Sequence, residues 1–151
     1  MKRIIHPVAG AVALLTIATF WLSTLATELF GSTASVIAVK TAIPWGFLHL
    51  VPALAAAGAT GFSMVKGRKP HGLVKRKAAR MPVIAANGVL VLIPAALFLA
   101  SRSRAGNLDT WFYVVQLVEL SAGAANITLL ALNLRDGLRM KGRLRQYRNA
   151  A

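Results

Sequence analysis

Four long apolar stretches dominate the pattern of hydrophobic and polar positions along the chain. They cover residues 4–30, 34–65, 81–100 and 111–133, and they lack the period-two alternation of barrel strands. An apolar run of about 20 residues is long enough to cross a bilayer as a helix. The pattern therefore predicts an all-α integral membrane protein, in which four helices form one up-and-down bundle over residues 1–151.

Proline interrupts the second and third predicted helices. Pro44 and Pro52 lie inside the second stretch, and Pro94 lies inside the third. Proline lacks a backbone N–H and clashes with the preceding helical turn, so we expect the second helix to be kinked.

The basic residues separate the two ends of this bundle. Two lie in the N-terminal lead, seven in residues 66–80 and six in residues 135–151, which makes fifteen of the 18 Lys and Arg residues. Cytoplasmic loops of membrane proteins carry such an excess. We therefore expect both termini and the 66–80 loop to be cytoplasmic, as in a bacterial inner-membrane protein.

The formal net charge of +14 has two explanations in a chain of this kind. In a soluble protein it would indicate nucleic acid, but here topology accounts for it, and we expect no nucleic-acid partner. The same basic segments would attract anionic lipid headgroups. Cysteine is absent, which excludes disulfides and thiolate metal sites.

The fourth stretch carries a row of polar residues along one side of its predicted helix. Gln116, Glu119, Asn126 and Asn133 recur at roughly helical spacing. A carboxylate near the bilayer centre costs about 2.5–3.5 kcal/mol on insertion scales. Glu119 therefore needs a partner from another helix.

Counting residues inward from the membrane boundary predicts which polar groups meet. With outer boundaries near Thr41 and Trp111, His49 and Glu119 each lie about 12 Å deep at 1.5 Å per residue. They are the predicted buried pair.

The same count, made inward from residue 100 in the third helix, places Asn87 about 20 Å deep, and it places Asn126 about 22 Å deep. These two amides form a second predicted layer. His6 lies near the cytoplasmic surface, where His71 of the basic loop can reach it.

Three functions fit these polar layers. The first is a small haem b protein for electron transfer, with His6, His49 and His71 as candidate iron ligands, because histidines of helical bundles bind haem. The second is an accessory or assembly subunit of a larger membrane complex, which suits short loops and the lack of a soluble domain.

The third is a proton- or cation-coupled transporter that uses Glu119 and His49, since ionisable residues inside membranes mark transport pathways. Four helices are few for a carrier, so this hypothesis implies a homo-oligomer. The sequence contains no glycine-rich phosphate loop and no nucleophile–base motif, and enzymatic activity stays open.

Overall fold

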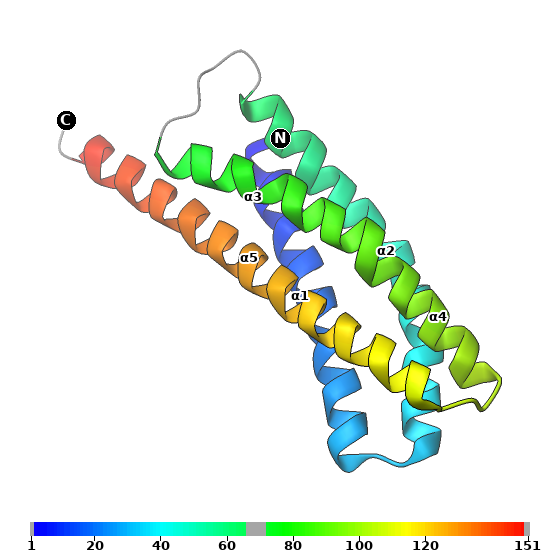
Figure 1. The fold of residues 1–151 in the computed structure, drawn as a ribbon. Helices are drawn as coiled ribbons and strands as arrows, with labels where there is room; N and C mark the ends of the chain where they lie inside the picture. Colours follow the sequence, from blue (N-terminus) through cyan, green and yellow to red (C-terminus); the bar gives the residue numbers. More distant parts are fainter. Residues whose placement is uncertain (1, 66–71, 150–151) are drawn as a thin grey trace.

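The computed structural model describes residues 2–65 and 72–149, with side chains for residues 4–63 and 72–139. These residues form α1 (Lys2–Phe30), α2 (Thr33–Val65), α3 (Leu73–Asn87), the π-helical turn η1 (Gly88–Leu92), α4 (Ile93–Arg104) and α5 (Thr110–Asn149). Because α3, η1 and α4 follow one another without a break, the fold has four helical rods (Figure 1). Each rod contains a segment that is long and apolar enough to cross a membrane, which confirms the predicted all-helical fold with four helices of membrane-spanning length.

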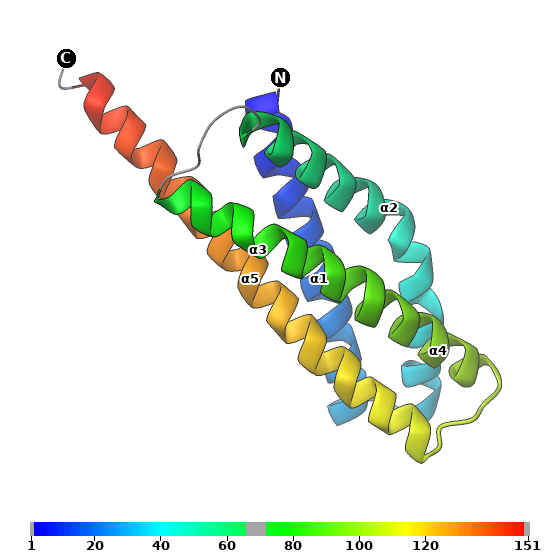
Figure 2. The ribbon, with the colours of Figure 1, turned by 45° about the horizontal axis from the view of Figure 1, so that its top comes forward.

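The four rods form an up-and-down bundle in which neighbours in sequence are neighbours in space. α1 packs against α2 and α5, and α4 packs against the same two helices. The diagonal pairs α1/α4 and α2/α5 make no backbone contact within the described residues. Both chain ends lie at one end of the bundle (Figures 1 and 2). We call this the basic end, and the opposite end, which holds residues 31–32 and 105–109, the turn end.

Local side-chain caps set the helix starts at the turn end. Ser32 accepts a hydrogen bond from the Ser35 backbone N–H at 3.3 Å, just before α2. Asp109 accepts one from the Phe112 N–H at 3.0 Å and pairs with Arg102, which closes the loop between α4 and α5. Gly106 has φ +69°, a left-handed conformation that glycine adopts without strain.

Two helices extend further at the basic end than the apolar pattern predicts. α3 begins at Leu73, eight residues before the predicted start at residue 81, and α5 continues to Asn149, past residue 133. The predicted 66–80 loop and 135–151 tail are therefore helical over much of their described length. Lys, Arg, Met and Ala are good helix formers, so charge ends the membrane-crossing segment without ending the helix.

The prolines of α2 act differently from Pro94 at the start of α4. α2 continues through Pro44 and Pro52 and curves along its length (Figure 2). Before Pro94 the helix widens into η1, where the Ile93 N–H reaches the carbonyl of Gly88, five residues back. The wider turn relieves the clash and the missing donor that proline imposes.

Close packing of small against large residues holds α1 against α2. A Cβ atom at Gly46 would overlap the ring of Phe20, so only glycine lets the two helices approach this closely. Nearby, Ala13, Ile17 and Leu50 belong to the main buried apolar cluster. The outer surface is rich in exposed large apolar residues, as expected for helices that face lipid.

Candidate functional site

An ion pair crosses the interior of the bundle near its turn end. The Lys40 ammonium on α2 donates to the Glu119 carboxylate on α5, and their side chains are only 1% and 12% exposed. Lys40 lies seven residues after the start of α2 and Glu119 nine after the start of α5, about 10 and 14 Å along the two helices. The pair thus joins the two diagonal helices whose backbones do not touch.

Further polar groups surround this pair. The Glu28 carboxylate, in the last turn of α1, acts electrostatically on Lys40, and Thr24 lies one turn earlier with 2% exposure. Gln116 precedes Glu119 by one turn on the same side of α5 and is 5% exposed. We call these five residues the Lys40 layer; with one ammonium and two carboxylates, its formal charge is −1.

Two oxygen atoms of the Lys40 layer are buried without a hydrogen-bond partner among the described residues. They are Oε1 of Glu28 and Oε1 of Gln116. Buried polar atoms are nearly always paired, and an unpaired one costs about 1–3 kcal/mol. The Lys40 layer therefore contains more hydrogen-bond acceptors than its own N–H and O–H groups satisfy.

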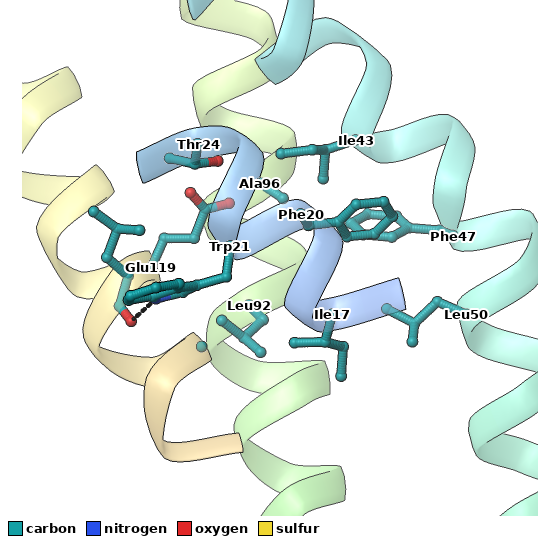
Figure 3. Close-up of a pocket in the computed structure, with 12 residues that line it drawn as sticks. Ile17, Phe20, Trp21, Thr24, Ile43, Phe47, Leu50, Leu92, Ala96 and Glu119 are labelled. Atoms are coloured by element: carbon teal, nitrogen blue, oxygen red, sulfur yellow. Dashed lines mark hydrogen bonds between the residues drawn. The ribbon is translucent and has the colours of Figure 1, made fainter. Parts of the chain in front are cut away.

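A small cavity lies beside Glu119, on the basic-end side of Thr24. Its volume is about 50 Å³, and residues from all four helical rods line it, among them Trp21, Phe47 and Leu92. Figure 3 shows Glu119 reaching from α5 toward Thr24, with Trp21 donating to the Leu120 carbonyl at 2.9 Å below it. Since a water needs roughly 10–15 Å³, the cavity has room for a few waters and is far too small for a porphyrin.

The structure does not form the predicted pair of His49 with Glu119. His49 is exposed on the outer side of α2, and it lies nine residues from Lys40, or two and a half helical turns. The two side chains therefore leave α2 in opposite directions. The depth estimate placed the outer boundary at Thr41, whereas α2 begins at Thr33, so Lys40 occupies the level that was assigned to His49.

The structure does bring Asn87 and Asn126 together. Asn87 Nδ2 donates to Asn126 Oδ1 and to the Ala122 carbonyl, both at 2.9 Å. Asn126 is 1% exposed, and its own amide donates to the Ile84 carbonyl at 3.4 Å. These bonds join α3 to α5 immediately before the π-helical turn.

Of the other two histidines, only His6 lies within the described residues. His6 is half-buried, and its Nδ1 lies 2.9 Å from the Ala57 carbonyl and 3.3 Å from Thr60 Oγ1. A carbonyl only accepts, so Nδ1 carries the proton and the bond ties α1 to α2. His71 lies outside the described residues, among which no group of three His, Asp or Glu side chains is placed to hold a metal.

Sequence reasoning missed a second charged cluster, at the basic end. Arg80 on α3 donates to Asp136 on α5 at 2.8 Å and to Asn133 Oδ1 at 3.3 Å. Arg135 and Lys77 also lie near Asp136, whose side chain is 3% exposed. The signal was available: Asp136 follows Glu119, Asn126 and Asn133 along the same side of the helix.

No family model, no curated protein and no solved structure matches this chain.

Proposed function

We propose that this protein is a small proton-coupled membrane carrier, in which the Lys40 layer binds the proton. The observation that supports it most is the buried Lys40–Glu119 pair with a second carboxylate, Glu28, beside it. Ionisable residues held inside a membrane bundle commonly mark proton and ion pathways. Lys40 takes the place that the sequence assigned to His49.

The charge of the Lys40 layer explains why it would take up a proton. A net charge of −1 is strongly disfavoured in low dielectric, so protonating one carboxyl group neutralises the layer. The new O–H can also donate to an acceptor such as Gln116 Oε1, which has no partner among the described residues. One proton therefore removes the excess charge.

The surroundings of Glu119 suit a site that gains and loses protons. The adjacent cavity has room for a few waters next to the carboxylate, and Leu92 of η1 forms part of its lining. π-Helical turns occur often at functional sites and allow a helix to change its local winding. We infer that movement at η1 alters access to Glu119 from the basic end.

The orientation and assembly that we propose follow from the charge distribution. The basic end faces the cytoplasm of a bacterial cell, so the Lys40 layer lies toward the external side of the inner membrane. Because four helices enclose only the small cavity described, we propose that a homo-oligomer forms the complete carrier.

Proton-coupled flux in proteoliposomes tests this proposal. Vesicles with an acidic lumen and a trapped pH dye receive Na⁺, K⁺ or ethidium outside, one at a time. We expect at least one cation to drive proton release through the wild-type protein. The rate should fall at least tenfold in Glu119→Gln, because the variant has no carboxylate there to exchange the proton.

Asp109→Asn provides the matched control, because it also converts an acid to an amide at the turn end. Asp109 is 47% exposed and lies outside the Lys40 layer, so we expect a rate within about twofold of wild type. Proton flux that is absent with all three cations, or that is unchanged in Glu119→Gln, would overturn the carrier proposal.

A second candidate is an accessory or assembly subunit of a larger membrane complex, and His49 favours it. This polar side chain is exposed beside Leu48 and Trp45, which are 69% and 70% exposed. A partner helix covering this side of α2 would remove the imidazole from lipid. Recovery of a stoichiometric partner that is lost in His49→Leu would support this role over the carrier.

The geometry adds no support to the haem b hypothesis. His6 and His49 belong to different levels of the bundle, and the described cavity is too small for a macrocycle. Haem bound through these histidines would need a surface between subunits. A visible spectrum of the purified protein with a Soret band would favour this function over proton coupling.

A further inference from the structure

The basic end holds more positive charge than its acid can neutralise. Near Asp136 lie Lys77 and Arg80 of α3 and Arg135 and Arg139 of α5. Among the described residues, Asp136 is the only acid at this end of the bundle. We call Lys77, Arg80, Arg135 and Asp136 the basic-end cluster.

Asp136 already binds one guanidinium group and has a second nearby. Oδ2 accepts from Arg80 at 2.8 Å, and Oδ1 lies 3.8 Å from Arg135 Nε. The Lys77 ammonium has no carboxylate within ion-pair distance in the described part of the chain. Lys77 is therefore a surplus cation held against the bundle.

The position of Lys77 directs its charge between helices instead of into open solvent. Its Nζ lies over Gly137 of α5, 3.6 Å from where a Cβ atom would stand, and it acts electrostatically on His6 of α1. Lys75, two residues earlier, is exposed. Two positions on a helix differ by about 200°, so the two lysines point to different sides of α3.

We infer that the basic-end cluster binds the phosphate of an anionic phospholipid, with Lys77 as a main donor. Asp136 lies 17 residues beyond Glu119, about 25 Å along α5, which places the cluster near a headgroup region if the Lys40 layer lies inside the bilayer. Exposed Ile4, Val8 and Val83 near this end offer apolar surface to the acyl chains.

This inference does not depend on the carrier proposal, because the two sites are separate. The chemistry recognised is a phosphate monoanion, and the adjacent lipid-facing apolar residues favour a lipid over free phosphate. Lysine binds phosphate as a point charge, and each interfacial basic residue strengthens binding to anionic lipid about fivefold.

Native mass spectrometry of the full chain in detergent tests the site. Phosphatidylglycerol and phosphatidylcholine are titrated separately, and dissociation constants are obtained from the lipid-bound peaks. We expect selective binding of phosphatidylglycerol by the wild-type protein. Lys77→Gln should weaken it about fivefold, while the matched control Lys75→Gln should change it by about twofold or less.

The other outcomes separate this site from simpler explanations. Equal weakening by Lys77→Gln and Lys75→Gln would show that diffuse surface charge attracts the lipid, and it would overturn the inference. Displacement of the lipid by millimolar inorganic phosphate would assign the site to free phosphate instead. A Lys77→Gln protein that still unfolds like wild type in phosphatidylcholine excludes misfolding as the cause.

Discussion

Replacing Lys40 with methionine should destabilise the bundle more than replacing Glu119 with glutamine. The Lys40 side chain is 1% exposed, and its removal leaves two carboxylates, Glu119 and Glu28, without a cation. Breaking a buried pair by removing one partner costs about 3–5 kcal/mol. We expect Lys40→Met to fall in this range.

Glu119→Gln should cost less, because Glu28 still neutralises Lys40. The loss is then close to that of one hydrogen bond to a charged group, about 1.5–3 kcal/mol. Glu28→Gln alone should cost less still, since the Lys40–Glu119 pair remains. The double variant Glu28→Gln/Glu119→Gln leaves Lys40 alone in the interior and should cost more than the two single changes added together.

Unfolding by sodium dodecyl sulfate in mixed micelles measures these differences, with the fluorescence of the three tryptophans as the signal. Each variant is compared with wild type at equal protein and lipid concentration. If Lys40→Met and Glu119→Gln cost the same, or if the two glutamate changes are additive, then Glu28 takes no part in the Lys40 layer. The net charge of −1 that we assign to the Lys40 layer would then be wrong.

Three further predictions concern packing and cofactors. Gly46→Ala should destabilise the bundle by about 1–3 kcal/mol in the same unfolding assay, because its methyl group overlaps Phe20, whereas Gly58→Ala meets nothing within 4 Å and should be neutral. Asn126→Ala should cost about 1–2 kcal/mol, because Asn87 loses one acceptor and the Ile84 carbonyl a donor; an unchanged midpoint would contradict this. Protein purified from haem-supplemented cells should show no Soret band, and a stoichiometric band would contradict our assignment.

The sequence predicts the four helices well, because the length of each apolar stretch can be read directly from its residue types. It also predicts the Asn87–Asn126 contact, even though the count from residue 100 to Asn87 crosses the π-helical turn η1. The error of pairing His49 with Glu119 has a specific cause. The depth was counted from an assumed membrane boundary at Thr41, although the predicted helix began at residue 34 and α2 begins at Thr33, eight residues before that boundary.

Which side of α2 faces inward is also hard to read from the sequence. Both sides are apolar in a membrane helix, so hydropathy does not separate lipid-facing from buried positions. Lys40 shares its buried side with Ile43 and Leu50, whereas His49 lies with exposed Trp45. The charge itself was the better guide, because a lysine within a membrane helix needs a counter-ion.

The central claim is that the Lys40 layer holds one proton in exchange with solvent. Infrared difference spectroscopy of the reconstituted protein between alkaline and mildly acidic pH measures this directly, through the C=O stretch of a protonated carboxyl group. The account predicts a band from a buried carboxyl that disappears in Glu119→Gln or Glu28→Gln and persists in Asp109→Asn. A spectrum without such a band, or one that both glutamine variants leave unchanged, would contradict it.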